Sequence, residues 1–315
     1  MRALESLLVD VTAGAPASGM KWTHRSLRTL RKALQRRGIK VARATIARLL
    51  RQMKFSLRTC RKRKAGTHDK DRERQFRYLT RLRNLYLTLG FPVISVDAKK
   101  KELVGEFKNP GRCWRRESRP VLDHDFPRWA KGRAIPYGVY DVGHNDGLVV
   151  IGTSHETPAF AVSAIRRWWL EVGRWRYWGK RRLLIEADAG GANGYRKWQW
   201  KEALQGLADA FGLIVTVTHY PSGASKWNPI DHRMFSLISG NWAGEPLESY
   251  EAVLGFIRTT RSSMGFHCRA RLDAKEYATG YKVTREAKKR IRLKPRAVLP
   301  KWNYTIWPHS KPTNC

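Results

Sequence analysis

The sequence has 315 residues and 42% hydrophobic content, enough for one large folded domain or two smaller ones. Its 62 Lys and Arg against 26 Asp and Glu give a formal net charge of +36, which would be self-repulsive without a polyanionic partner. This composition excludes a disordered tail, and no apolar run approaches the roughly 20 residues of a membrane-spanning helix. Nucleic acid is the expected partner, and an anionic membrane surface is the weaker alternative.

Neither the N-terminus nor the cysteines indicate secretion. The apolar patch Leu7–Val9 is interrupted by Asp10 and is too short for a signal peptide, so it predicts the start of a helix in a cytoplasmic protein. The four cysteines are isolated from one another, with no C-x-x-C pair and no histidine at zinc-finger spacing. Neither zinc nor a disulfide framework is therefore expected at Cys60, Cys113, Cys268 and Cys315.

Residues 1–60 contain two consecutive helical patterns. Ser26 can cap the first helix and Gly38 ends it, and the second begins near Arg43. Basic residues stud the second helix, at Arg43, Arg48, Arg51 and Lys54. This pattern favours a helix-turn-helix DNA-binding region whose second helix enters the major groove. A plain helical hairpin with a solvated basic face is the alternative.

Residues 61–90 are assigned to a basic linker and a connecting helix. The linker begins with four consecutive basic residues, Arg61, Lys62, Arg63 and Lys64. Phe76, Leu79 and Leu82 follow at helical spacing. In a chain of this charge, we expect the basic run to bind DNA phosphates without sequence preference and in a salt-dependent way.

Residues 91–240 read as one α/β core. Val93–Asp97 has the nearly all-apolar pattern of a buried strand, and residues 99–135 form an insertion without clear periodicity. A hairpin follows, made of strands 137–142 and 148–152 around an Asn145-containing turn. A helix then begins at Thr157 and Pro158, by the rule that places such residues at helix starts.

The second half of this core alternates strands and helices. It contains a strand before Asp188, a helix closed by Gly212, the strand 213–217 and a capped helix carrying Asp231. The order of strand, hairpin, helix, strand, helix, strand and helix predicts a ribonuclease H-like mixed sheet with flanking helices, preceded by the all-α helix-turn-helix region. Residues 241–315 are assigned to a C-terminal helical and basic extension.

Three carboxylates are predicted to meet at one end of this sheet. Asp97 closes the first strand, Asp188 follows the fourth, and Asp231 begins the last helix. The first and fourth strands are neighbours in such a sheet, and three clustered carboxylates would repel one another strongly. Mg²⁺ relieves that repulsion and prefers oxygen ligands. A pair of ions about 3.5–4 Å apart would support in-line phosphodiester chemistry, with the three aspartates as metal ligands and catalytic residues.

Each aspartate also has a simpler interpretation. Asp97 could pair with the lysines that follow it, Asp188 could form a turn, and Asp231 could stabilise the helix start behind Asn228 and Pro229. The order of elements and the charge of the chain favour the joint catalytic interpretation. Other acids could support the site without joining it, namely Asp141, Glu186 and Glu102, and the nearby His219 and His232 are left out of the metal set.

Further DNA contacts are expected around the proposed site. Lys99 and Lys100 directly follow the first aspartate, and Lys226 precedes Trp227 in the loop before the last helix. Trp227 lies outside the helical patterns that place other tryptophans in the core. It is therefore the best candidate for stacking on DNA bases.

Three blocks of the sequence resemble those of a known family. They are residues 95–105 around Asp97, residues 188–196, and residues 225–233, which hold the segment Ser-Lys-Trp-Asn-Pro-Ile-Asp. They are similar to the signature blocks of the Rhodopirellula-type DDE transposases, of the ISAzo group of bacterial insertion sequences. The resemblance extends from about Trp22 to Pro308, nearly the whole chain.

The resemblance implies a bacterial, nucleoid-associated DNA transposase. It implies two Mg²⁺ ions, for which Mn²⁺ can substitute, binding to terminal inverted repeats and target DNA, and cleavage followed by strand transfer, with a homo-oligomer on the DNA. The family's third block usually ends in Glu, whereas this chain has Asp231, and its N-terminus is shorter than usual. The alternative expectation is a truncated or inactive remnant that acts only as a DNA-binding protein.

Overall fold

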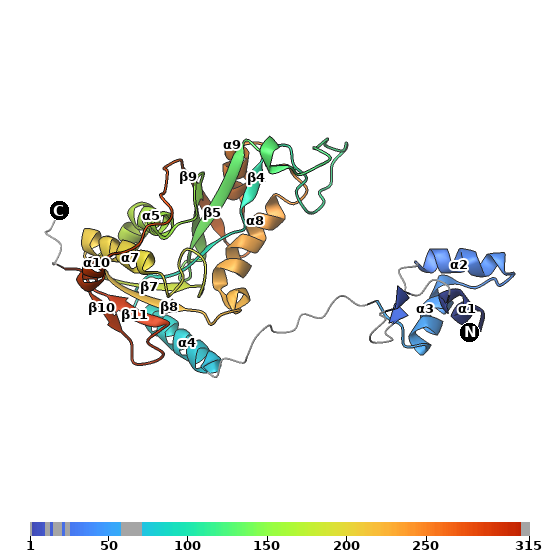
Figure 1. The fold of residues 1–315 in the computed structure, drawn as a ribbon, viewed down its shortest axis with the longest axis horizontal. Coiled ribbons are helices and arrows are strands. Elements are labelled where there is room, and N and C mark those ends of the chain that lie inside the picture. The colour runs from blue at the N-terminus through green and yellow to red at the C-terminus, as the bar shows by residue number, and fades with distance from the viewer. Residues whose placement is uncertain (1, 10–12, 15–20, 23–25, 58–70, 310–315) are drawn as a thin grey trace. The chain divides into compact units, whose positions relative to one another are not determined.

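The computed structural model describes residues 2–9, 13–14, 21–22, 26–57 and 71–309. The chain divides into two compact units, Met1–Ala65 and Gly66–Cys315 (Figure 1). The predicted basic run Arg61–Lys64 lies outside the described residues, as do Cys60 and Cys315, whereas Cys113 and Cys268 are free thiols. No helix in the described ranges is long and apolar enough to cross a membrane.

The first unit contains a small helical core. Its elements are α1 (Arg2–Val9), β1 (Ala13–Gly14), β2 (Lys21–Trp22), α2 (Leu27–Arg36) and α3 (Arg43–Gln52). Ser26 caps α2 as predicted, because its Oγ accepts the Thr29 N–H at 3.1 Å. Helix α1 buries Leu4, Leu7 and Leu8 in one cluster with Leu30, Leu34 and Ile46. Helix α1 therefore completes the core of the two predicted helices, and it ends at the patch Leu7–Val9 rather than starting there as predicted.

The second unit is built on a mixed sheet. Its central strands are β3 (Val93–Ala98), β5 (Gly132–Asp141), β6 (Asp146–Gly152), β7 (Arg182–Ala187) and β8 (Ile214–His219). Strand β3 pairs antiparallel with β5 and parallel with β7, β5 pairs antiparallel with β6, and β7 pairs parallel with β8. This confirms the predicted α/β sheet, with its antiparallel part extended by two parallel strands.

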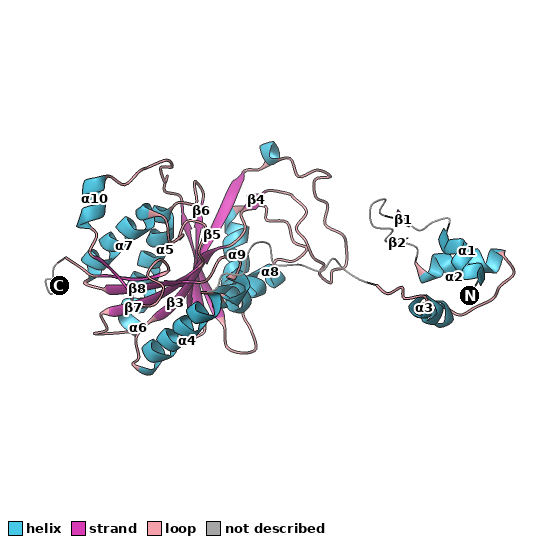
Figure 2. Cartoon of the chain, turned by 60° about the horizontal axis from the view of Figure 1, so that its bottom comes forward, coloured by secondary structure: helices cyan, strands magenta, loops and turns pink. Residues whose placement is uncertain are grey.

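Helices cover both faces of this sheet (Figure 2). On one face α5 (Pro158–Trp168), its continuation through residues 169–173 to α6 (Arg174–Arg176), and α7 (Trp198–Phe211) bury a large apolar cluster. On the other lie α4 (Arg72–Thr88), the π-helical segment Asp231–Phe235 that continues as α8 (Ser236–Asn241), and α9 (Tyr250–Thr259). The predicted α5 cap is confirmed, since Thr157 Oγ1 accepts the Phe160 N–H at 3.2 Å.

The C-terminal region adds strands that the sequence analysis did not predict. Strand β9 (His267–Asp273) pairs parallel with β6, and β11 (Asn303–Ile306) pairs antiparallel with both β8 and β10 (Leu293–Pro295). Strand β9 alternates small buried residues with arginines, which is typical of an edge strand with one solvent-exposed face. Because the strand contains no continuous apolar run, the sequence pattern did not predict it. The remaining elements are β4 (Glu102–Val104), two 3₁₀ turns (Pro127–Trp129 and Ser225–Trp227) and α10 (Arg285–Arg290).

Helix α4 packs directly on the sheet and does more than connect two regions. Its Arg83 donates from Nε and Nη2 to the two carboxylate oxygens of Glu186, at 2.7 and 2.6 Å, and also to Tyr220 Oη at 2.6 Å. Glu186 is fully buried on β7. Burial raises the pKa of its carboxyl group, and the ion pair with Arg83 opposes that rise. The pair therefore fixes α4 against the strand that precedes Asp188.

We predict that Arg83→Met lowers the free energy of unfolding of the second unit by about 3–5 kcal/mol, because it leaves a buried carboxylate unpaired. The measurement is urea unfolding of the full chain, followed by far-UV circular dichroism. The double variant Arg83→Met/Glu186→Gln should recover most of the loss, because the amide removes the buried charge. A loss of less than about 1 kcal/mol in the single variant would contradict the assigned role of this ion pair.

Candidate active site

Asp97 and Asp188 lie at the same edge of the sheet. Because β3 and β7 run parallel, with Val96 paired to Ala187, the two strands end side by side. Asp97 is the second-last residue of β3, and Asp188 follows the last residue of β7. The carboxyl ends of parallel strands are where α/β sheets collect ligands.

Asp231 is brought to this edge by a close approach of its helix to β5. Gly138 pairs with Asp97 across the β3–β5 ladder. A Cβ atom at Gly138 would lie 2.3 Å from Met234 Cε and 2.8 Å from Ile230 Cδ1. A side chain at this position would therefore displace the ends of Met234 and Ile230, and glycine lets the helix that carries Asp231 pack closely against the strand beside Asp97.

Asn228 links all three segments, which the sequence analysis missed. We expected Asn228 to cap the Asp231 helix, but its Nδ2 instead donates to Asp188 Oδ1 at 3.0 Å. Its Oδ1 accepts the Ser95 hydroxyl, and Ser95 Oγ in turn accepts the Ile230 N–H at 3.2 Å. Asn228 and Ser95 are both fully buried. The two side chains therefore connect β3, the Asp188 loop and the Asp231 helix.

The three carboxylates repel one another without a compensating cation. Burial and the charge of Asp188 raise the pKa of Asp97 to about 8, with smaller contributions from Asp231 and Glu156, while the Ala98 N–H opposes the rise. Burial raises the pKa of Asp188 to about 6, against the Asn228 hydrogen bond and together with the Asp231 charge. The pKa of Asp231 is also raised by burial. No described lysine or arginine forms an ion pair with any of the three.

Glu156 is a fourth acid near this edge, and no sequence pattern indicated it. It lies between β6 and α5, where its Oε1 would be 3.6 Å from a Cβ added to Gly191, in the loop after Asp188. Its Oε2 is 3.4 Å from Lys101 Nζ. In sequence it is an ordinary acid in a short loop, and only the pairing of the strands brings it near Asp97.

The residues at this edge suit a hard divalent cation. The buried Tyr137 hydroxyl has no hydrogen-bond partner in the described part of the chain, and the charges of Asp97, Glu156 and Asp188 help to raise its pKa. Carboxylate oxygens with unneutralised charge, beside an unpartnered hydroxyl, are ligands that Mg²⁺ or its bound water accepts. Among the described residues, no three acidic, histidine or cysteine side chains already converge at metal-binding distance.

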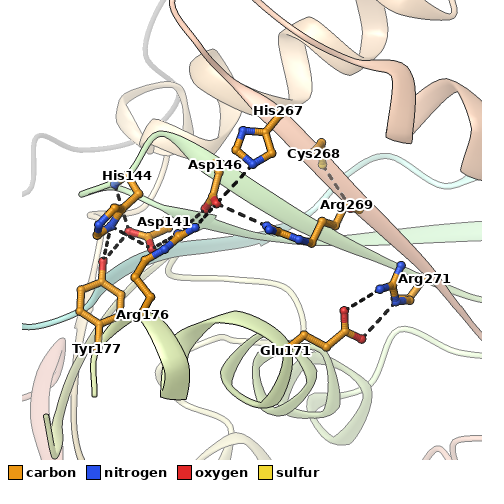
Figure 3. A network of polar contacts seen from close by, with 10 residues as sticks. All are labelled: Asp141, His144, Asp146, Glu171, Arg176, Tyr177, His267, Cys268, Arg269 and Arg271. Atoms are coloured by element: carbon orange, nitrogen blue, oxygen red, sulfur yellow. Dashed lines mark hydrogen bonds and ion pairs between the residues drawn. The ribbon is translucent and has the colours of Figure 1, made fainter. Parts of the chain in front are cut away.

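The competing acids have partners of their own. Asp141 pairs with Ile94, at the other end of β3 from Asp97, and accepts hydrogen bonds from Arg176 and Tyr177, each at 2.8 Å (Figure 3). Arg176 also binds the buried Asp146, so this network ties the β5–β6 hairpin to α6. Glu186 forms an ion pair with Arg83, and Glu102 forms an ion pair with Lys99 at 2.9 Å.

The two histidines near the site differ in burial. His219 is fully buried, with Nδ1 2.9 Å from the Asp188 carbonyl oxygen and Nε2 3.2 Å from Tyr304 Oη. Burial lowers the pKa of His219 to about 4, so the ring is neutral at pH 7 and Nδ1–H donates to the loop that carries Asp188. His232 is exposed and contacts the Lys226 carbonyl oxygen.

The predicted DNA-binding side chains are mostly exposed. These are Arg43, Arg48, Arg51, Lys54, Lys100 and Lys226. Trp227 is 43% exposed and lies between the cations of Arg72 and Lys226, at 4.8 and 4.2 Å from its ring centre. Lys99 is different, because its ammonium group pairs with Glu102 and lies 4.5 Å from the Trp242 ring centre. Its charge is therefore largely used within the protein.

Together, the mixed sheet and its carboxylate edge define a nuclease-like or transferase-like α/β core. A family model described as the Rhodopirellula transposase DDE domain matches residues 3–308. The chain therefore belongs to the Rhodopirellula DDE transposase family, which confirms the resemblance of its three sequence blocks. No curated protein matches the sequence significantly.

Solved structures show more distant likenesses. The chain is similar to the Mos1 transposase paired-end complex with left transposon end, at 16% identity and a TM-score of 0.42, covering 80% of this chain and 68% of that one. The Mos1 strand transfer complex gives 14% identity and a TM-score of 0.43, covering 80% and 67%. The Mos1 mariner paired end complex with Mn gives 15% identity and 0.40, covering 80% and 68%. The family assignment rests on the sequence match alone.

We predict that Asp97→Asn stabilises the metal-free protein at alkaline pH. The folded state raises the pKa of Asp97 above its unfolded value, so it binds more protons than the unfolded state between pH about 4 and 8. The stability that the protonated Asp97 side chain contributes is therefore lost as pH rises through about 8. The asparagine side chain does not titrate, so the variant undergoes no such loss. The measurement is chemical unfolding in EDTA at a series of pH values.

The control for this experiment is Asp123→Asn, which changes a largely exposed carboxylate outside any ion pair with lysine or arginine in the described residues. It should leave the pH profile as in the wild type. Equal unfolding free energies for the wild type and Asp97→Asn at pH about 9 would show that Asp97 is not strained by its neighbours.

Proposed function

We propose that the chain is a DNA transposase that binds the terminal inverted repeats of its insertion sequence and catalyses Mg²⁺-dependent cleavage and strand transfer. The carrying observation is the position of Asp97, Asp188 and Asp231 at one edge of the sheet, where burial raises the pKa of all three, neighbouring aspartates raise those of Asp97 and Asp188 further, and no described lysine or arginine forms an ion pair with them. Membership of a DDE transposase family and the net charge of +36 support the same activity. A strongly basic chain is suited to a polyanionic substrate.

Asp97, Asp188 and Asp231 would hold two Mg²⁺ ions, or Mn²⁺ in their place. When bound, these ions activate the attacking oxygen and stabilise the leaving 3′ oxygen of the phosphodiester. The protein's own contribution is positional. Asn228 orients the Asp188 carboxylate, and the neutral His219 holds the loop that carries Asp188 through its carbonyl group. Orientation of this kind lets the ligands bind without reorganisation.

DNA binding in this proposal is shared between the two units. Helix α3 of the first unit carries Arg43, Arg48 and Arg51 as exposed side chains, as a helix that enters the major groove requires. In the second unit, Lys226 and Trp227 stand five and four residues before Asp231 and are exposed. Because a transposase must hold two element ends and a target, we also propose that the chain acts as a homo-oligomer on double-stranded DNA.

We predict that the purified full chain nicks the ends of its own element in Mg²⁺ or Mn²⁺ but not in EDTA. Asp97→Asn should reduce nicking by more than about 100-fold, since even residues that only orient metal ligands cost about 10–100-fold when replaced. DNA affinity should stay within about twofold of the wild type. The measurements are denaturing gels of end-labelled DNA and fluorescence anisotropy.

The matched control is Asp123→Asn, which should nick as the wild type does. Equal nicking by Asp97→Asn would contradict the catalytic assignment. Tight DNA binding with no nicking by either the wild type or Asp231→Glu would favour the alternative, an inactive remnant that only binds DNA. Cleavage with no preference for the repeat sequence would indicate a nuclease of the same fold.

A further inference from the structure

A groove that neither the sequence analysis nor the family match assigns opens beside the carboxylate edge. It has a volume of about 710 Å³ and lies between the N-terminal ends of α5 and α7 and the segment 278–288. Four basic residues line it, Arg196, Lys197, Lys282 and Lys288. Two aromatic rings line it as well, Trp198 and Tyr281, which are 37% and 52% exposed. We call it the Trp198 groove.

The groove lies next to the candidate active site. The loop that carries Asp188 runs on through Tyr195 to Arg196, which lines the groove. Glu156 also lines the groove and lies close to Gly191 of that same loop. A strand that follows this loop away from the carboxylate edge would therefore reach the groove.

Basic residues lie at the N-terminus of helix α7, where positive charge is unfavourable unless an anion is bound there. Helix α7 has no acidic residue in its first turn and no side-chain cap, and the basic residues Arg196 and Lys197 directly precede its first residue. Cations at a helix N-terminus are unfavourable, whereas a bound anion there is stabilised by the exposed N–H groups and the helix dipole. Helix α5 begins in the same groove, at Thr157 and Pro158. This arrangement fits a chain of phosphates.

Neighbouring side chains contact both aromatic residues and restrict their positions. The Tyr281 hydroxyl donates to Glu202 Oε1 at 3.2 Å, and the Tyr281 carbonyl oxygen accepts the Gln199 side-chain amide at 2.5 Å. Trp198 contacts the ammonium groups of Lys201 and Lys288, at 4.6 and 5.4 Å from its ring centre. Exposed rings among cations are the pattern that binds unpaired bases, because each base stacks on a ring while its phosphate meets a cation. In duplex DNA the bases already stack on one another.

We propose that the Trp198 groove binds an unpaired DNA strand that leads from the carboxylate site. Phosphates contact Arg196, Lys197 and Lys282, and one or two bases stack on Trp198 and Tyr281. This inference rests on the proposed function, since it gives the path of a strand at the reacting phosphodiester. It adds a single-strand site to the duplex-binding surfaces already proposed.

The first test is binding of a fluorescein-labelled oligodeoxythymidine of about 12 nucleotides to the full chain, by anisotropy. Trp198→Ala and Tyr281→Ala should each weaken this binding about fivefold or more, the loss expected for one stacked base. Trp198→Phe should retain most of the affinity, because the ring is kept. Binding of the matching duplex should change less than about twofold in all three variants.

The control variant is Trp175→Ala, which removes an exposed ring outside the groove that also contacts a cation, since it is 60% exposed and its ring centre lies 4.4 Å from the Arg174 guanidinium group. It should leave single-strand binding unchanged. Unchanged single-strand binding in Trp198→Ala and Tyr281→Ala would overturn the inference, as would an equal loss for duplex and single strand.

The second test locates the strand directly. The same oligonucleotide, carrying 5-iodouracil, is photocrosslinked to the wild-type chain, and the modified peptides are identified by mass spectrometry. Adducts within residues 196–201 or 278–288 support the inference, and adducts found only elsewhere overturn it. A chain that crosslinks here but does not nick DNA would contradict the proposed function alone. A chain that nicks its element ends without crosslinking here would contradict only the groove.

Discussion

The pairing of β3 with β7 is the constraint on which the rest of the site depends. It brings Asp97 and Asp188 to one edge of the sheet, although they are far apart in sequence. The cost is electrostatic, because burial and the charge of neighbouring aspartates raise the pKa values of both side chains. Strain of this kind is typical of functional sites, where the folded structure holds groups in place that would otherwise separate. The ion pair between Arg83 and Glu186 helps to keep β7 in that position, because Glu186 lies on β7 two residues before Asp188.

Packing brings the third carboxylate to the same edge without a strand of its own. Gly138 has no side chain opposite Asp97, so Ile230 and Met234 rest directly on β5. Ser95 and Asn228 then connect the helix to β3 and to Asp188 by buried hydrogen bonds. Gly138 therefore sets the distance between the Asp231 helix and β5, and the hydrogen bonds of Ser95 and Asn228 also fix the orientation of that helix, which apolar contacts alone would not do.

The sequence predicted the central strands and most helices, because apolar runs, Thr157 at a helix start and Gly212 at a helix end are local signals. It did not predict β9, whose arginines alternate with small residues, or the place of Glu156, which depends on long-range pairing. Asn228 precedes the helix as predicted, but its side chain binds Asp188 and Ser95 instead of capping the helix, and only the fold shows those partners within reach. The Trp198 groove joins segments about 80 residues apart, and no local pattern signals it.

The central claim is that Asp97, Asp188 and Asp231 bind a divalent metal together. Its most direct test replaces Mg²⁺ with Fe²⁺ and adds ascorbate and peroxide, so that hydroxyl radicals formed at the bound ion cut the nearby backbone. The account predicts cuts close to residues 97, 188 and 231 in the wild type, all suppressed by excess Mg²⁺ and all lost in Asp97→Asn. Cuts confined to other segments, or a pattern unchanged in Asp97→Asn, would contradict it.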